Sequence, residues 1–279
     1  MGIGAGPGTA KNGITVGAHG NRYSSNSADG MYYWSSRGPT DDGRIKPDIV
    51  AAGDYIRSCK AQEATEAPDN LNDQWYVEYS GTSMATPAAA GASAIIREYL
   101  MEIAERPDPQ GALVKAMLIL GAEDMGTRDI PNNDEGWGRI NLVNTLLPDS
   151  DVGIFVDDRS RLSSGQEASY NFDVTRSGEP LKVVLTWSDY PGSTFSGTQL
   201  RNDLNLEVTS PDGTVTYLGN DFANGRSATG GGKDAKNNVE VVLIDSASTG
   251  IWNVKVKDFS HGGGRTYQPF AIAVRGVYV

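Results

Sequence analysis

The spacing of apolar residues changes near residue 148, and this change limits the folds open to the chain. Before it, short apolar runs at residues 14–16 and 48–50 alternate with longer stretches in which apolar residues recur every three or four positions. After it, apolar and polar residues alternate, as in residues 170–174. Strands that alternate with helices predict an α/β fold, and period-2 alternation predicts strands with one face in water. The sequence therefore predicts an α/β domain over residues 1–148 and an all-β antiparallel sandwich over residues 149–279.

Two helices are predicted in the first domain. The stretch from Ser83 to Glu105 is almost continuously small or apolar, which predicts a buried helix. A second helix is expected from Pro109 to Gly121, because apolar residues recur there with helical spacing. In the second domain, the turn-forming residues Pro211-Asp212-Gly213 separate two alternating runs, as in a β-hairpin.

The composition argues against nucleic acid and membranes as partners. Thirty-five acidic side chains against 24 basic ones give a formal net charge of −11, which repels phosphate backbones and anionic lipid. No apolar run approaches the roughly 18 residues that span a bilayer, and residues 1–8 lack the basic and apolar segments of a signal peptide. Cys59 is the only cysteine, so an intrachain disulfide and a cysteine-based zinc site are excluded.

Ser83 lies in the stretch that says most about chemistry, Gly81-Thr82-Ser83-Met84-Ala85-Thr86-Pro87. A glycine turn brings the serine to the first turn of the predicted helix. Unpaired backbone N–H groups and the positive end of the helix dipole stabilise an anion there. Taken alone, the same residues also suit an ordinary serine at a helix N-terminus.

This seven-residue stretch resembles the nucleophile motif of the subtilisin-like serine proteases, the subtilase family. Two further segments resemble the family in order and spacing: residues 34–40 (WSSRGPT) with residues 46–53 (KPDIVAAG), and residues 136–141 (GWGRIN). The β-rich half resembles the jelly-roll domain that follows the catalytic domain in one alkaline branch of the family. The resemblance implies a partial subtilase parallel sheet with helices, a jelly roll after it, and an extracellular serine endopeptidase.

In the mechanism that this resemblance implies, Ser83 attacks the peptide carbonyl and forms an acyl-enzyme, while Thr82 and Ser83 belong to the oxyanion site at the helix N-terminus. The family's aspartate and histidine come before the serine in the chain, as does an oxyanion asparagine. No matching motif precedes Ser83, and the two histidines, His19 and His261, stand in other settings. The chain thus resembles only the C-terminal part of a subtilase, and we expect it to be weak or inactive as a protease by itself.

Three interpretations stay open at this point. The chain can pair with an N-terminal fragment that supplies the missing groups and then act on polypeptides. Separately, the sheet edge that the missing early strands would leave open predicts self-association. Ser83 can act alone as an esterase, because activated esters need less transition-state stabilisation than amides. The sandwich can be a non-catalytic module stabilised by calcium.

Oxygen donors gather on the predicted loops of the second domain, at Asp189, Asn202, Asp203 and Asp221. Calcium takes about six to eight oxygen ligands, which these residues can supply. The alternative is that the same residue types only form turns. The resemblance to calcium-carrying jelly rolls implies a structural Ca²⁺ here. Asp189 and Asp203 are the foremost predicted ligands.

Overall fold

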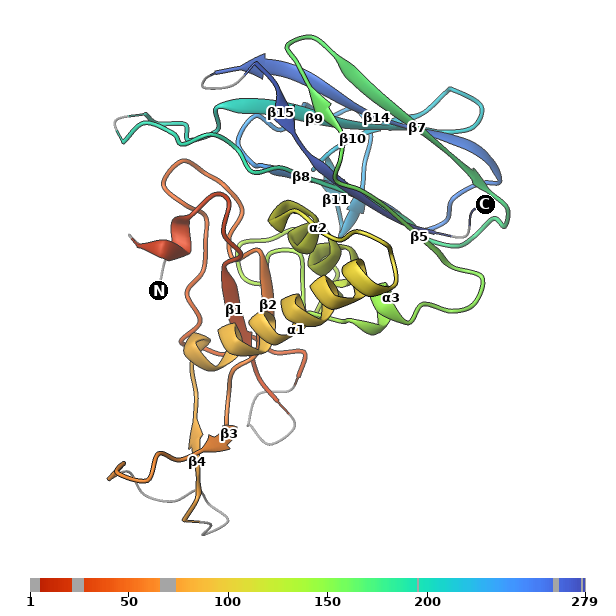
Figure 1. The fold of residues 1–279 in the computed structure, drawn as a ribbon. Coiled ribbons are helices and arrows are strands. Elements are labelled where there is room, and N and C mark those ends of the chain that lie inside the picture. The colour runs from red at the N-terminus through yellow and green to blue at the C-terminus, as the bar shows by residue number, and fades with distance from the viewer. Residues whose placement is uncertain are drawn as a thin grey trace.

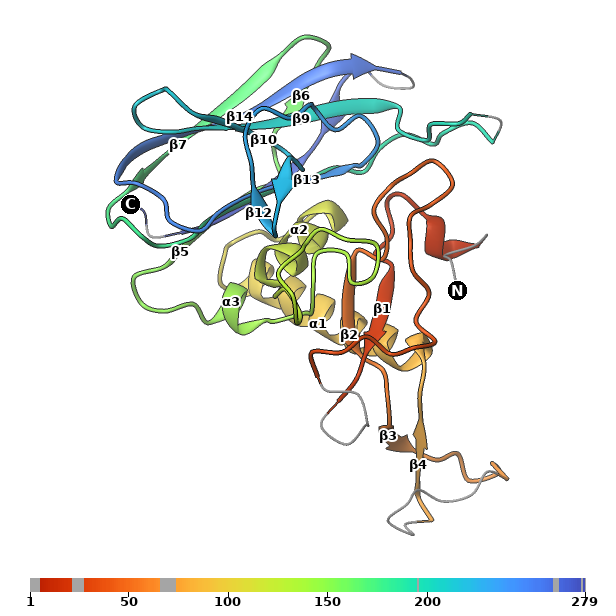
Figure 2. The ribbon, with the colours of Figure 1, turned by 180° about the vertical axis from the view of Figure 1, so that it is seen from behind.

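The computed structural model describes residues 6–21, 28–65, 74–194, 196–262, 266–276 and 278. In these residues an α/β part lies against a two-sheet sandwich, and a hairpin projects from the α/β part on the side away from the sandwich (Figure 1). The view from behind shows α2 between the sandwich and the other elements of the α/β part (Figure 2). The predicted order of an α/β segment followed by a β-sandwich is confirmed.

Two parallel strands and two long helices form the α/β part. Its elements in chain order are η1 (Pro7–Thr9), β1 (Val16–His19), β2 (Ile49–Ala52), β3 (Ile56–Cys59), β4 (Tyr76–Tyr79), α1 (Thr82–Glu102), α2 (Gly111–Gly121) and α3 (Val143–Leu146). Strands β1 and β2 pair in parallel, from Val16 opposite Ile49 to His19 opposite Ala52. Strands β3 and β4 form the projecting antiparallel hairpin.

Two four-stranded antiparallel sheets form the sandwich. Its strands are β5 (Gly153–Asp157), β6 (Arg161–Leu162), β7 (Glu167–Val174), β8 (Leu181–Thr186), β9 (Asn202–Thr209), β10 (Thr216–Leu218), β11 (Phe222–Ala223), β12 (Arg226–Ser227), β13 (Val239–Ile244), β14 (Gly250–His261), β15 (Gln268–Pro269) and β16 (Ala271–Gly276). One sheet has the order β10-β9-β14-β7 and the other β13-β8-β16-β5. The alternating run at residues 170–174 falls in β7, and residues 211–213 lie in the turn between β9 and β10, as predicted. Residues 204–208 and 252–256 alternate in the same way and lie in β9 and β14.

Strand β8 is buried on both of its faces. Leu181, Val183 and Leu185 pack in the core between the two sheets, whereas Val184 belongs to the core around the helices. The helices and the sandwich therefore share one continuous interior. Helix α3 ends at Leu146 and β5 begins at Gly153, so the predicted domain boundary after residue 148 stays a prediction.

Helix α1 differs from its prediction, because only one of its sides is buried. The buried residues are Ala85, Ala89, Ala92, Ile96 and Leu100. On the other side Ile95 is 50% exposed, next to exposed Ala88 and Gly91. Strands β1 and β2 and helix α2 pack on one side of α1, and no other described element packs against it comparably. A sequence of small and apolar residues therefore does not by itself mean that a helix is buried on every side.

Candidate active site around Ser83

The backbone at the start of α1 is held tightly against the ends of the parallel strands. The N–H of Gly81 donates to the carbonyl of Gly53 over 2.6 Å, and the N–H of Gly53 donates to the carbonyl of His19 over 3.1 Å. A Cβ on Gly53 would lie 2.6 Å from the Cβ of Ala18 and 2.7 Å from the carbonyl oxygen of Gly81, so only glycine fits there. Gly81 has φ 149°, a conformation that L side chains rarely adopt. These two glycines fix the first turn of α1 beside the carboxyl ends of β1 and β2.

Ser83 is exposed on this first turn. The carbonyl of Gly81 accepts from the N–H groups of Met84 and Ala85, so those of Thr82 and Ser83 precede the first intrahelical hydrogen bond. Donors of this kind, at the positive end of a 21-residue helix, can stabilise an oxyanion. The geometry suits the roles predicted for Ser83 and Thr82, which stay predictions.

Neither histidine forms a hydrogen bond with Ser83 in the described part of the chain. His19 is 6% exposed at the end of β1, its Nδ1 lies 2.5 Å from the carbonyl of Gly20, and burial lowers its pKa. His261 lies in the sandwich, with Nδ1 2.9 Å from Asp258. A general base for Ser83 is thus not assigned among the described residues.

Sequence reasoning missed a polar link beside the nucleophile. The hydroxyl of Ser80 donates to Asp54 over 2.8 Å and accepts from the backbone N–H of Tyr55 over 2.8 Å. Tyr55 has φ 51°, an uncommon conformation for a non-glycine residue. The link ties the strand leading into α1 to the turn after β2. The sequence carried only a weak signal for it, a serine three positions before Ser83.

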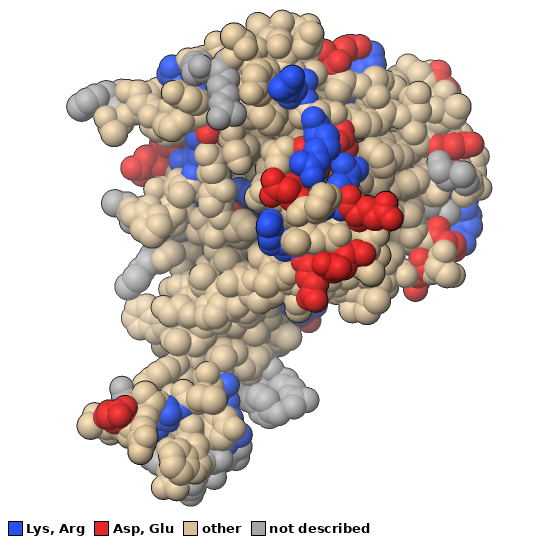
Figure 3. Space-filling model, in the orientation of Figure 1, with Lys and Arg blue, Asp and Glu red and all other residues tan. Residues whose placement is uncertain are grey.

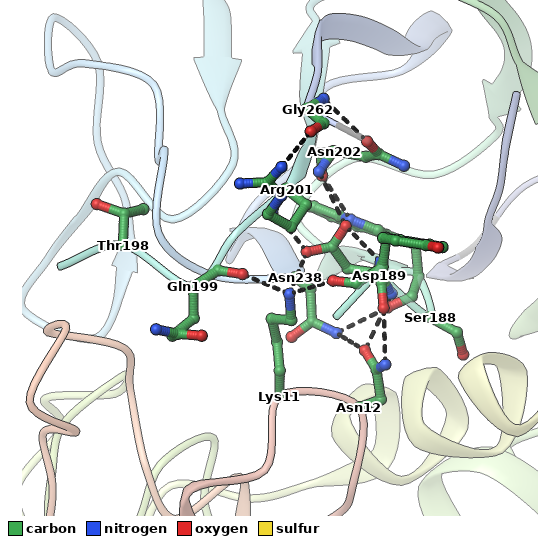
Figure 4. A network of polar contacts seen from close by, with 12 residues as sticks. Lys11, Asn12, Ser188, Asp189, Thr198, Gln199, Arg201, Asn202, Asn238 and Gly262 are labelled. Atoms are coloured by element: carbon green, nitrogen blue, oxygen red, sulfur yellow. Dashed lines mark hydrogen bonds and ion pairs between the residues drawn. The ribbon is translucent and has the colours of Figure 1, made fainter. Parts of the chain in front are cut away.

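Asp189, a predicted calcium ligand, is already paired with a cation of the chain itself. The ammonium of Lys11 lies 2.5 Å from its Oδ2, and both side chains are buried. Oδ2 also accepts from the N–H of Arg201, and Oδ1 accepts from the N–H groups of Tyr190 and Asn202 (Figure 4). The ammonium of Lys11 thus occupies the place beside Asp189 where a bound metal ion would have to lie. The interaction joins the start of the chain to the sandwich.

Two other predicted ligands also have hydrogen-bond partners. Asn202 donates from Nδ2 to Gln268 over 2.9 Å and accepts at Oδ1 from the N–H of Gly262 over 3.1 Å. Asp221 accepts at Oδ2 from the N–H of Gly231 over 2.9 Å. The four predicted residues do not form one group of free oxygens, and their role as ligands stays a prediction.

Asp203 has a different environment from the other three predicted ligands. It is 6% exposed, and its Oδ1 has no hydrogen-bond partner among the described residues. Burial, with the nearby charge of Asp234, raises the pKa of Asp203 to about 6. Two other residues, which sequence reasoning missed, also are buried and carry side-chain polar atoms without hydrogen-bond partners in the described structure. Within the described ranges, Asn205 is 2% exposed with neither side-chain polar atom paired, and Glu240 is 1% exposed with Oε1 unpaired. The signal for Glu240 was an acid inside the apolar run of residues 239–244.

A second acidic group, also missed by sequence reasoning, follows α2. Ligand atoms of Asp124, Asp129 and Glu135 all lie within 4.8 Å of one another. The amide of Asn132 already donates to Asp129 over 2.6 Å and to Glu135 over 3.1 Å. Burial raises the pKa of Glu135 to about 7. An amide donor thus links two of the three carboxylates.

Comparison with known proteins finds two family models along the chain. Residues 4–138 match the subtilase family, and residues 196–268 match the proprotein convertase P-domain. No helix among the described residues is long and apolar enough to cross a membrane.

Three curated relatives illustrate the similarity. The serine protease/ABC transporter B family protein tagD of Dictyostelium discoideum is 30% identical, over 77% of this chain and 15% of that protein. Serine protease AprX of Bacillus subtilis is 35% identical, over 51% of this chain and 31% of that protein. Minor extracellular protease Vpr of the same species is 35% identical, over 42% of this chain and 14% of that protein. The chain thus spans less than a third of each of these relatives.

Proposed function

The chain belongs to the subtilase family through residues 4–138, and from this premise we propose that it supplies the nucleophile of a serine endopeptidase that cleaves peptide bonds through an acyl-enzyme on Ser83. One observation carries the proposal: Ser83 is exposed on a helix start that Gly53 and Gly81 hold at the ends of two parallel strands. A serine there can approach a carbonyl carbon while the N–H groups at the helix start bind the oxyanion.

The residues of this chain account for only part of the catalytic cycle. Ser83 forms the bond to the acyl group, and the N–H groups of Thr82 and Ser83 with the helix dipole stabilise the negative charge. The proton of the Ser83 hydroxyl needs an acceptor, which a polypeptide segment like the earlier part of a subtilase domain would bring. That segment can precede these residues in one polypeptide or be a separate chain.

The exposed side of α1 supports pairing with such a segment. From Thr82 to Ile96 the helix contains no charged residue, whereas an exposed helix face normally carries them. Charged side chains gather over the sandwich and the C-terminal end of α1, and the surface over its first turns is largely without them (Figure 3). Among the described strands β1 pairs along its length only with β2, but on its other edge Ala18 already bonds to Ser35 and Tyr32, so the edge left for a further strand is the part before Ala18. Self-association through the same edge is the competing outcome.

Hydrolysis rates of an activated ester and of casein test the assignment of Ser83. The 279-residue chain alone should hydrolyse an activated ester slowly and leave casein intact, because its base is missing. Adding a fragment with the family's aspartate and histidine motifs should start casein hydrolysis. Ser83→Ala should abolish both activities, and Ser93→Ala, a second serine of the same helix, should retain them. An ester rate that Ser83→Ala leaves unchanged would show that Ser83 is only a helix-start residue and that the ester activity lies elsewhere.

We also propose that the sandwich binds a structural Ca²⁺ and that the protein works outside the cell. Buried carboxylate and amide oxygens that have no partner among the residues the structure describes, Asp203 among them, support the calcium site, since hard oxygen donors suit this ion. Calcium would add positive charge to a group of buried acids and so stabilise the folded sandwich. The location is supported by the relative named as an extracellular protease.

A further inference from the structure

We propose that a cavity between the C-terminal end of α2 and the sandwich binds a small, doubly charged oxyanion of the sulfate or phosphate type. Arg275 of β16 and Lys182 of β8 lie on its wall, together with Leu120 and Asn144 from the α/β part. Its volume of about 160 Å³ is several times what one water molecule requires, so an ion of this size fits. Ser83 is not on this wall, and the site does not depend on the function proposed for that residue.

The first argument is that the sheet sets two cations side by side. Lys182 and Arg275 are direct partners in the antiparallel pairing of β8 with β16, so both side chains lie on the same face of the sheet. Like charges in directly opposite positions destabilise a sheet. Burial, and then the neighbouring charge of Arg275, lower the pKa of Lys182 to about 7. An anion bound beside both side chains would offset this repulsion.

The second argument is that neither cation forms an ion pair within the described part of the chain. Nζ of Lys182 donates to the carbonyl oxygens of Ile119 and Ala122, over 2.7 and 3.2 Å. Nε of Arg275 donates to the carbonyl of Asn144 over 3.0 Å, and its two terminal NH₂ groups have no hydrogen-bond partner among the described residues. The planar fork of a guanidinium matches two oxygens of one oxyanion. These groups of Arg275 are therefore left to hold the ion.

The third argument is the charge around the cavity. Among the described residues Asp124 is the one carboxylate on the wall, and its Oδ2 accepts from two backbone N–H groups. Arg128, also on the wall, shares the carboxylate of Asp245 with Arg226. With the two cations of β8 and β16, these residues make four positive side chains and two carboxylates, in a chain whose net charge is −11. This local excess of positive charge matches a doubly charged anion.

The position of the cavity gives the ion a consequence for the whole chain. Lys182 contacts the end of α2, and Arg275 contacts α3 through the carbonyl of Asn144. Both side chains come from the sheet with the order β13-β8-β16-β5. An oxyanion held between them would fix the sheet against the two helix ends. Because such an ion binds only the folded chain, it would stabilise the junction between the helices and the sandwich.

Calorimetric titration of the 279-residue chain with sodium sulfate tests the site, at pH 6 and at an ionic strength held constant with sodium chloride. Sulfate is doubly charged at this pH, and Lys182 is protonated below its pKa. Wild type should bind one sulfate. Arg275→Gln should raise the Kd about tenfold, because it removes charge-assisted hydrogen bonds. Arg159→Gln removes a charge near the other end of α2, where Asp158 pairs with Arg159 and accepts from Gln110, and should keep the Kd within twofold.

Melting temperatures separate an arginine that binds the ion from one that is only structural. Sulfate strengthens burial in proteins generally, so the quantity to compare is the difference in melting temperature between sulfate and chloride of equal ionic strength. This difference should be smaller in Arg275→Gln and Lys182→Met than in wild type and Arg159→Gln. A purely structural Arg275 would lower the melting temperature equally in both salts. Equal differences in all four proteins, or no heat of binding for wild type, would overturn the proposal, as would sodium acetate that binds as tightly as sulfate.

Discussion

Helices α1 and α2 lie side by side in the same half of the molecule, yet their surroundings differ. In α2 every residue after Gly111 is buried, Lys115 included. In α1 only five residues along one side are buried, and Ile95 on the other side is half exposed. Helix α2 packs against α1 on one side and against β8 and β16 of the sandwich on another. No element in the described part of the chain covers the other side of α1 as the sandwich covers α2.

The difference shows that the described structure encloses α2, whereas α1 presents a surface to which another polypeptide segment can bind. Around α2, even polar side chains form hydrogen bonds between the sandwich and the helix. Lys182 of β8 donates to the carbonyl oxygens of Ile119 and Ala122, and Thr186 donates to that of Ala112 over 2.7 Å. Along α1 from Thr82 to Ile96, the residues that face outward are uncharged and mostly small. Substitutions on the two helices should therefore have unequal effects.

The largest expected effect comes from truncating one apolar side chain on each helix. Leu113→Ala in α2 removes a fully buried side chain and should lower the free energy of unfolding by about 3 kcal/mol. Ile95→Ala in α1 should change it by less than about 0.5 kcal/mol in the chain alone. Urea denaturation followed by circular dichroism measures both. Equal losses would mean that α1 is covered in solution, by a partner or a second copy.

A pH series tests the cost of enclosing Lys182 against α2. Burial lowers the pKa of Lys182 to about 7, below its ordinary value of 10.5. Between these two pH values the unfolded chain holds the proton and the folded chain releases it, so stability should rise with pH across this window. The contribution is at most about 1.4 kcal/mol per pH unit. Below pH 7 both states are protonated and the contribution is constant.

Replacing the lysine isolates this contribution. Lys182→Met should flatten the rise in the free energy of unfolding between pH 7 and 10. Lys255→Met, on an outward position where the ammonium pairs with Glu167, should keep the wild-type slope. Urea titrations at pH 7, 8, 9 and 10 give the slopes. If Lys182→Met retained the full slope, the titrating group would be another one, such as Lys46, whose pKa is lowered to about 8.

The smallest expected effect comes from a single hydroxyl on each helix surface. Thr186→Val removes a buried hydrogen bond to α2 and should cost about 1 kcal/mol. Thr86→Val on α1 removes an exposed bond to the carbonyl of Thr82 and should cost less than about 0.5 kcal/mol. Thermal melting of the pair gives the difference. The reverse order would contradict the picture of α2 as the more enclosed helix.

Local patterns in the sequence predicted much of the fold. Alternation along β7 and β14 is set by neighbouring residues, as is the glycine turn before Ser83. The exposure of Ile95 was not predictable in this way, because it depends on what packs against α1 rather than on the helix itself. The same limit applies to Asp189 and Glu240. Their environments are decided by Lys11, 178 positions away, and by Leu206, 34 positions away.

The ion pair between Lys11 and Asp189 has a consequence for synthesis of the protein. A ribosome that adds about 5 to 20 residues per second emits Asp189 roughly 10 to 35 seconds after Lys11. Strand β8, which covers α2, ends three residues before Asp189 and emerges equally late. During that interval the nascent first half has neither the carboxylate for Lys11 nor the cover for α2. Its native packing is completed only after translation has passed into the sandwich, so the C-terminal half determines when the nucleophile's own half can finish folding.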